Sequence, residues 1–221
     1  MDAAIESRSP NRLALRRFGK NRRAIVCFWL LLAIGLSTMA VPWVSPHGYR
    51  TQRLERSREA PSADYWMGTD KNGRDVMVRT FHGGRISFAV GLLATTVSLL
   101  VGVAYGAVSG FAGGRTDALL MRFVDVLYGL PHMFLVIIAM SLLGRTFLVV
   151  FIALGLFSWM TTARIVRGQV LSLKEKEFVE AARGLGAGAP SIILRHMIPN
   201  VIGPVIVYAT LTVPSVMLQE A

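Results

Sequence analysis

Long uncharged stretches of apolar residues dominate the pattern along this chain. The hydrocarbon core of a bilayer is about 30 Å thick, so a helix that crosses it needs roughly 20 mainly apolar residues. Five runs without an internal charge approach or exceed that length: residues 24–44, 86–112, 130–144, 146–163 and 198–219. The pattern predicts an all-α integral membrane protein, a polytopic helical bundle with five visible spans. No clear small-x-small cleavage site follows the first run, so it is interpreted as a retained anchor.

The composition agrees with a membrane protein and narrows its partners. Of the 221 residues, 53% are hydrophobic and 17% are charged, whereas soluble domains carry about 25% charged residues. The formal net charge of +11 raises nucleic acid as a partner. No zinc-finger spacing or stacking motif accompanies the charge, so we expect no nucleic-acid binding. Lys and Arg that flank membrane spans account for the charge more simply.

The basic residues are distributed unequally between alternate loops. The loops on one side (1–23, 113–122 and 164–197) hold fifteen Lys or Arg, whereas the opposite loops hold nine. Lys and Arg accumulate on the cytoplasmic side, which predicts a multi-pass protein of the cell membrane with a cytoplasmic N-terminus. The expected organisation is a cytoplasmic basic tail (1–23), a first transmembrane helix (24–44), an extracytoplasmic segment (45–85) and a transmembrane core (86–221) that includes the cytoplasmic loop 164–197.

Small residues recur at every fourth position along the second run. They are Ala94, Ser98, Gly102, Gly106, Gly110 and Gly114. This spacing places them on one face of a helix, and small side chains allow a second helix to approach closely in lipid. We therefore predict a helix-packing face.

Charged residues also precede the third run. Arg122 and Asp125 are three positions apart, a spacing at which two side chains on one helix can form an ion pair. Ionisable groups near a membrane often mark a transport pathway. Because this pair lies at the expected membrane interface, a structural ion pair is the favoured interpretation.

The polar segment 164–197 separates the fourth and fifth runs. Residues 169–183 have the apolar spacing of an amphipathic helix, and the glycine-rich stretch 184–188 then favours a turn. Pro190 suits the first turn of a second short helix at 191–197. The pattern predicts a cytoplasmic helical knob that can dock on a partner, with an ordinary helical loop as the alternative.

A spaced motif runs through this segment. Its members are Glu180, Ala181, Ala182, Gly186, His196, Ile198 and Pro199. The motif resembles the EAA loop of permeases of binding-protein-dependent ABC importers, with Gly186 and Pro199 in register. His196 replaces the isoleucine of the general pattern, which is similar to the dipeptide, oligopeptide and nickel branch of these permeases.

Two further stretches resemble the same branch. Residues 68–75 have the sequence GTDKNGRD, similar to its G-T-D-x-x-G-R-D signature before the second span. Gly113, Gly114 and Asp117 begin a stretch similar to its next signature, which ends at Pro131. The resemblance covers about residues 12–221. Members usually continue through a sixth span, so we expect that this chain lacks its C-terminal part.

The resemblance implies a permease of the type I ABC importer kind that forms half of a translocation pathway, with peptide as the favoured cargo. Its implied partners are ABC ATPase subunits, a second homologous permease subunit, an extracytoplasmic solute-binding protein and membrane lipid. Glu180 would pair with a basic residue of the ATPase. The expected ATPase-coupling residues are Phe178, Glu180, Ala181, Ala182, Gly186, His196 and Pro199.

Other functions remain as alternatives. Similar permeases carry nickel or other small solutes, and a secondary transporter or channel subunit is a more distant alternative. The four histidines are scattered, and no phosphate-binding loop has the required Lys. We therefore expect a non-catalytic subunit with no cofactor and no metal site.

Overall fold

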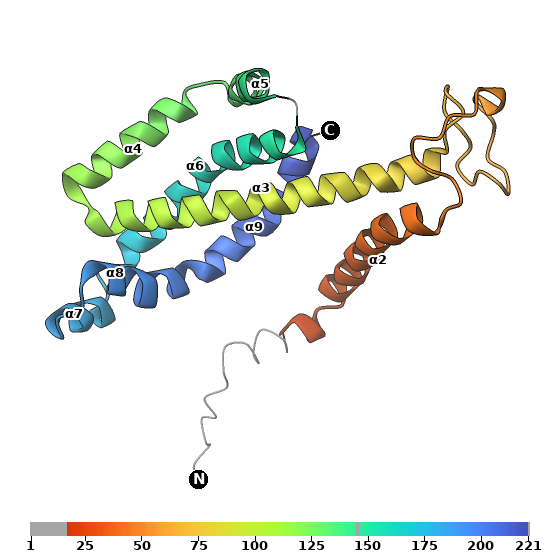
Figure 1. Cartoon of the computed structure of the whole chain (residues 1–221). Helices are drawn as coiled ribbons and strands as arrows, with labels where there is room; N and C mark the ends of the chain where they lie inside the picture. Colours follow the sequence, from red (N-terminus) through yellow and green to blue (C-terminus); the bar gives the residue numbers. More distant parts are fainter. Residues whose placement is uncertain (1–16, 145, 221) are drawn as a thin grey trace, which may run out of the picture. The chain divides into compact units, whose positions relative to one another are not determined.

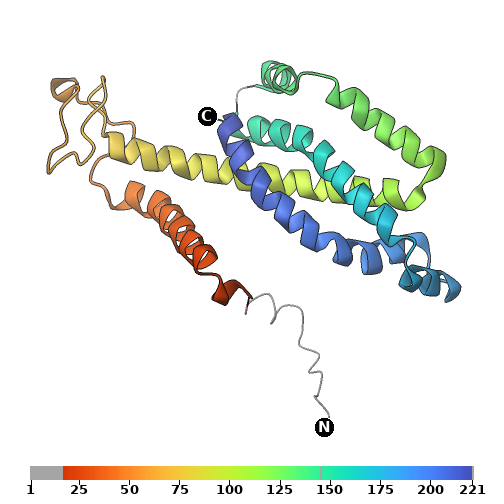
Figure 2. The same ribbon diagram turned by 180° about the vertical axis from the view of Figure 1, so that it is seen from behind.

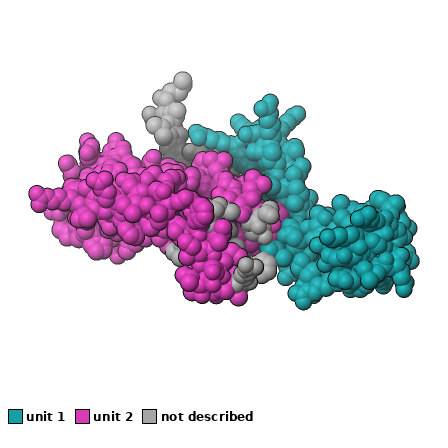
Figure 3. All heavy atoms as spheres, turned by 90° about the horizontal axis from the view of Figure 1, so that it is seen from above, with its two compact units in different colours: residues 1–86 teal, residues 87–221 magenta. Residues whose placement is uncertain are grey.

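The computed structural model describes residues 17–144 and 146–220, with the side chains at 132, 133, 147, 150, 151, 154, 156 and 220 left undescribed. The described residues form helices and no β-strand, apart from one isolated antiparallel bridge between Thr69 and Asp75. The all-α prediction is therefore confirmed. The chain divides into two compact units, residues 1–86 and residues 87–221 (Figure 3). The predicted tail 1–23 lies mostly outside the described residues.

The first unit contains the helix α2, Arg22–Val44 (Figure 1). The side chain of Asn21 caps its first turn by accepting a hydrogen bond from the backbone N–H of Ala24 at 3.2 Å. Large apolar side chains such as Trp29, Leu31 and Leu36 are exposed along it. An exposed apolar surface on all sides of a helix is typical of a helix surrounded by lipid. After α2 the chain contains the short 3-10 helix η1, Leu54–Arg56.

The helix α3, Val76–Ala112, continues into the second unit, where the remaining helices follow (Figure 2). These are α4 (Gly114–Tyr128), α5 (His132–Leu143), α6 (Phe147–Leu173), α7 (Glu177–Gly184), α8 (Ala189–Ile192), the π-helical turn η2 (Ile193–Met197) and α9 (Ile198–Glu220). Gly113 and Gly114 have φ of 66° and 55°. Residues with a Cβ are disfavoured at such angles, so the sharp turn between α3 and α4 depends on this glycine pair.

Three helical segments among the described residues are long and apolar enough to cross a membrane: Arg22–Val44, Val76–Ala112 and Ala189–Gln219. They contain the first, second and fifth predicted runs. The third run falls in α5, where the apolar helix Phe134–Leu143 is shorter than a bilayer requires. The fourth run falls in α6, which has 27 residues. The protein is a multi-pass membrane protein, and the count of five spans stays a prediction.

The small residues of α3 lie against α6. A Cβ on Gly102 would lie 2.5 Å from the Cβ of Thr162, and one on Gly106 would meet the carbonyl oxygen of Ala163. Ala94 and Ser98 are buried on the same face. Ser98 Oγ lies 3.3 Å from Thr162 Oγ1, a direct hydrogen bond between the two helices.

The two ends of this stripe differ. Gly110 belongs to it, because a Cβ there would lie 2.9 Å from the carbonyl oxygen of Arg167. Gly114 does not, since α3 ends at Ala112 and Gly114 opens α4 with free space around it. The period of four breaks at the turn because a straight continuation of α3 is interrupted by the left-handed conformation of Gly113 and Gly114.

Two predictions for the α6–α9 connection are wrong. Residues 169–183 do not form one helix: α6 ends at Leu173, and the chain turns through residues 174–176 before α7 begins. The turn allows α7 to direct its own apolar face at the core, which a straight helix could not do. Residues 191–197 are no separate helix either, because α8, η2 and α9 follow one another without a break.

Pro199 is accommodated in the first turn of α9 by the π-helical turn before it. Proline has no N–H and its ring clashes with the carbonyl four residues earlier in a regular helix. Here the N–H of Ile198 bonds to the carbonyl of Ile193, five residues earlier. The side-chain amide of Asn200 donates to the carbonyl oxygen of His196 at 2.7 Å. The chain passes the proline as a helix instead of ending there.

The close contact between α3 and α6 gives a test. We expect Gly106→Ala to lower the free energy of unfolding by about 1–3 kcal/mol, because the added methyl group overpacks against the backbone of α6. Gly168→Ala, on α6 with open space around it, is the matched control and should cause no loss. Thermal unfolding of the purified full-length protein in detergent measures both. Equal stability of the two variants would contradict the close approach.

Candidate functional site

The helix α7 presents two different faces. Val179 and Ala182 point inward and belong to a buried cluster with Val166 and Val170 of α6 and Val201 of α9. This cluster anchors α7 on the ends of two long helices. The opposite face of α7 is solvent-exposed.

The outer face of α7 combines apolar and charged groups. Glu180 and Ala181 are exposed. The side chain of Phe178 is 39% exposed to solvent, and that of Leu185, just after the helix, is 89% exposed. Exposed apolar side chains on a short projecting helix are typical of a docking surface. We call Phe178, Glu180, Ala181 and Leu185 the outer face of α7.

The expected coupling residue Ala182 is only 8% exposed. It lies inside the subunit's own core, so its small size serves the packing of α7 on α6. The surface that remains available to a partner contains Glu180 and Ala181. Within the E-A-A tripeptide, Glu180 and Ala181 therefore face solvent, whereas Ala182 faces the helical bundle.

Gly186 ends α7 in a left-handed conformation with φ of 82°. The N–H of Ala187 bonds to the carbonyl of Ala182 at 3.0 Å, and the N–H of Gly186 bonds to the carbonyl of Arg183 at 2.9 Å. This pair of bonds is a Schellman motif, in which glycine at the left-handed position closes the helix. A Cβ on Gly186 would meet nothing within 4 Å, so the glycine is required by backbone conformation and not by crowding.

His196 and Pro199 lie behind α7, on the π-helical turn and the start of α9. The ring of His196 is 6.4 Å from that of Phe178, centroid to centroid. The structure therefore brings Phe178 and His196 together. Pro199 is exposed and follows the π-helical turn that contains His196.

A partly buried ion pair connects α4 to α6. Arg167 donates from Nε and Nη2 to the two carboxylate oxygens of Asp117, both at 2.6 Å. Ser109 of α3 donates to the same carboxylate at 2.6 Å. Two parallel hydrogen bonds between a guanidinium and a carboxylate give both strength and geometry. Three helices therefore meet at Asp117.

The predicted pair of Arg122 with Asp125 is not formed. Asp125 accepts a hydrogen bond from Nη2 of Arg164 on α6 at 2.7 Å, and the guanidinium of Arg164 lies 4.3 Å from the ring centre of Tyr128. Arg164 is 39 positions away in the sequence, so local spacing did not indicate it. The interaction between α4 and α6 replaces the expected pair within one helix.

The GTDKNGRD stretch forms a tight turn in the first unit. Asp70 Oδ1 accepts from the backbone N–H groups of Asn72 at 2.8 Å and Arg74 at 3.0 Å, and Oδ2 accepts from Arg74 Nε at 3.1 Å and from Arg79. The backbone N–H of Arg74 contributes most to holding the pKa of Asp70 at about 2. Asp75 caps α3 by accepting from the N–H of Val78 at 3.2 Å. The polar side chains of this turn therefore hold its backbone and the start of α3 in place.

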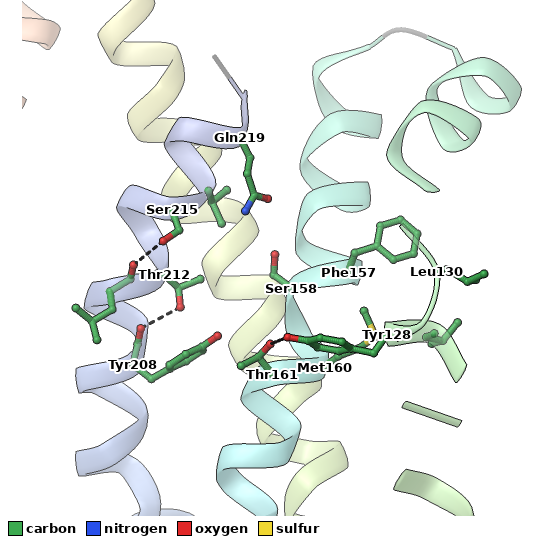
Figure 4. A pocket seen from close by; sticks show the side chains of 13 residues that line it. Tyr128, Leu130, Phe157, Ser158, Met160, Thr161, Tyr208, Thr212, Ser215 and Gln219 are labelled. Atoms are coloured by element: carbon green, nitrogen blue, oxygen red, sulfur yellow. Dashed lines mark hydrogen bonds between the residues drawn. The ribbon is translucent and has the colours of Figure 1, made fainter. Parts of the chain in front are cut away.

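A recess between the end of α4, α6 and α9 was not predicted. It has a volume of about 360 Å³, and its polar side chains include Tyr128, Thr161, Tyr208 and Thr212 (Figure 4). None of the motifs or apolar runs in the sequence indicated these polar side chains as a group. A signal was present: Tyr208, Thr212, Ser215 and Gln219 are spaced by four, three and four positions, one face of a helix.

These observations define the class: a multi-pass helical membrane protein that carries a short projecting helix between two of its long helices. Residues 73–221 match the family described as binding-protein-dependent transport system inner membrane component. Residues 9–61 match the N-terminal TM domain of oligopeptide transport permease C. The chain belongs to this family of inner membrane components, and the resemblance inferred from its motifs is confirmed.

Three relatives show the similarity. The chain is 45% identical to the oligopeptide transport system permease protein OppC of Haemophilus influenzae, over 98% of this chain and 70% of that protein. It is 43% identical to the dipeptide transport system permease protein DppC of Bacillus subtilis, over 94% and 65%. It is 43% identical to OppC of Escherichia coli, over 98% and 72%. The chain spans about two thirds of the length of these relatives.

The ion pair at Asp117 gives a second test. We expect Asp117→Asn to lower the free energy of unfolding by about 2–3 kcal/mol, because Arg167 loses its carboxylate in a mostly buried site. Asp125→Asn is the control, since Asp125 and Arg164 are exposed and such pairs contribute at most about 1 kcal/mol. Thermal unfolding of the full-length protein measures both, and equal losses would refute the distinction.

Proposed function

We propose that this chain is the permease subunit of an ATP-driven peptide importer and that α7 couples it to a separate ATPase subunit. The observation that supports coupling is the two-sided character of α7. Its inner face is packed on α6 and α9, and its outer face is exposed. A helix that is fixed on one side and exposed on the other can transmit the movement of a docked partner to the bundle.

The proposed mechanism needs only a two-state bundle. Nucleotide binding would move the ATPase subunits, and the ATPase groove that holds α7 would carry the helix with it. Because Val179 and Ala182 are packed against Val166, Val170 and Val201, α6 and α9 would shift together with α7. A rigid element biased between two arrangements by a ligand is a recognised basis of switching.

Peptide is the proposed cargo because the relatives are named as oligopeptide and dipeptide permeases. The same names favour peptide over nickel, and membership of a binding-protein-dependent family argues against an ion-coupled transporter or a channel. A second permease subunit and an extracytoplasmic solute-binding protein complete the proposed assembly. In that assembly the N-terminus is cytoplasmic, which puts α7 on the ATPase side.

The first test concerns the end of α7. Placing a Cβ on a left-handed residue costs about 1–2 kcal/mol. We therefore expect Gly186→Ala to reduce ATP-driven uptake of a peptide into vesicles by about fivefold or more, the factor that corresponds to 1 kcal/mol in an equilibrium. Gly184→Ala, two residues earlier in open space and without a positive φ, is the control. Unchanged uptake by Gly186→Ala would refute a role for this turn.

The second test separates docking from folding. We expect Leu185→Asp to abolish co-purification of the ATPase subunit with the full-length permease, because a carboxylate replaces an exposed apolar contact. Thermal stability of the permease alone should not change, since Leu185 packs on nothing in its own subunit. Leu194→Asp, at an exposed apolar position of η2, introduces the same charge and is the matched control. Normal ATPase recovery with Leu185→Asp would contradict docking through the outer face of α7.

A further inference from the structure

The recess between α4, α6 and α9 has a chemistry that no assigned role explains. Its volume of about 360 Å³ lies at the lower end of the range of about 300–1,000 Å³ found for small-molecule sites. Figure 4 shows Tyr208 of α9 extending toward α6, where Thr161 and Ser158 face it. The recess lies wholly within the second unit.

Among the residues that the structure describes, none that lines this recess carries a formal charge. Its polar groups are hydroxyls and one amide, set among apolar side chains such as Phe157, Met160 and Leu211. Arg164 and Asp125 lie three positions along the chain from the lining residues Thr161 and Tyr128, and they are paired with each other at 2.7 Å. The site is therefore suited to a polar but uncharged group.

Two hydroxyls of α9, those of Thr212 and Ser215, keep acceptor capacity for a further hydrogen bond. Thr212 donates to the carbonyl of Tyr208 at 2.9 Å, and Ser215 donates to the carbonyl of Leu211 at 3.1 Å. A hydroxyl that donates within its own helix still has lone pairs that accept from another N–H. Gln219 has both a donor and an acceptor on its amide. The lining can therefore bond both the N–H and the C=O of an amide.

We propose that this recess is a binding site for peptide main chain within the translocation pathway, a proposal that rests on the proposed function. Thr212 and Ser215 accept hydrogen bonds from substrate N–H groups, and Tyr208 and Gln219 donate to substrate carbonyl oxygens. Because the groups recognised are common to every peptide bond, the site does not select side chains. Because it lacks charge, it does not require free peptide termini.

The test uses single-cysteine variants of the full-length permease in its complete transporter. The described chain has one cysteine, Cys27 on α2, so Cys27→Ser gives the background. Tyr208→Cys and Thr161→Cys place thiols on the two sides of the recess. Ile206→Cys, exposed on α9 and outside the recess, is the matched control for a lipid-facing position.

The variants in membranes are treated with a negatively charged, membrane-impermeant methanethiosulfonate. We expect Tyr208→Cys and Thr161→Cys to react about tenfold faster than Ile206→Cys, since the hydrated thiolate is the reactive form. A saturating concentration of N-acetyl-trialanine-amide, which has peptide bonds but no charge, should slow both reactions by about tenfold. Alanine, which has no peptide bond, should leave the rates unchanged.

Two results would overturn the proposal. Unreactive thiols at Tyr208 and Thr161 would show that lipid or another part of the transporter fills the recess. Reactive thiols that only free trialanine protects, and not the capped peptide, would show that the termini are recognised instead. Peptide uptake by the Cys27→Ser background is measured in parallel. Its absence would refute the proposed function itself, independently of the labelling.

Discussion

The arrangement of the second unit depends on the absence of side-chain atoms where α3 meets α6. At Gly102 and Gly106 a Cβ would meet the Cβ of Thr162 and the carbonyl of Ala163. In lipid there is no hydrophobic force that drives one apolar helix onto another, so close packing and hydrogen bonds must supply the association. The glycines allow that packing, and the contact between Ser98 and Thr162 adds a hydrogen bond within it. With α6 held against α3 in this way, α6 also contacts α4 and α7.

The helix α6 has a different partner on each of its sides. One side is packed on α3, and Arg167 holds α4 through Asp117. Farther along, Val166 and Val170 enter the cluster that contains Val179 of α7. Thr161 lies one and a half turns before Val166 and lines the recess. A helix is stiff over such distances, so a displacement of α7 reaches the recess through α6 without any additional element.

The sequence predicted most of what hydrophobicity and backbone sterics determine. The apolar runs became α2, α3 and α9, and the spacing of Gly102, Gly106 and Gly110 indicated a packing face that lies against α6. Such features follow from properties of single segments. The motif resemblance indicated the family for the same reason, because its residues are close together in the chain.

The features that the sequence did not predict depend on contacts between segments that are distant in the chain. Asp125 pairs with Arg164 across 39 positions, and a spacing rule within one helix could not identify that partner. The break at residues 174–176 follows from the demand that α7 bury Val179 and Ala182, which is a tertiary requirement. The recess needs three helices to exist at all. The sequence alone contains a signal only for the α9 side of the recess, namely the polar residues spaced by three or four positions along that helix.

The distribution of charge in this protein fits a pathway that must release its cargo. A strongly basic chain, with formal net charge +11, has a recess whose described lining residues are all neutral. Two cations of α6 are neutralised: Arg164 by Asp125 and Arg167 by Asp117. An unpaired cation there would bind the carboxylate of a peptide and retain it in a medium of low dielectric constant. Hydroxyl groups bind each amide weakly, and movement through a pathway requires binding that is favourable at entry and weak enough to leave. The paired charges therefore hold the helices together, and in the proposed pathway the neutral lining would leave the cargo free to move.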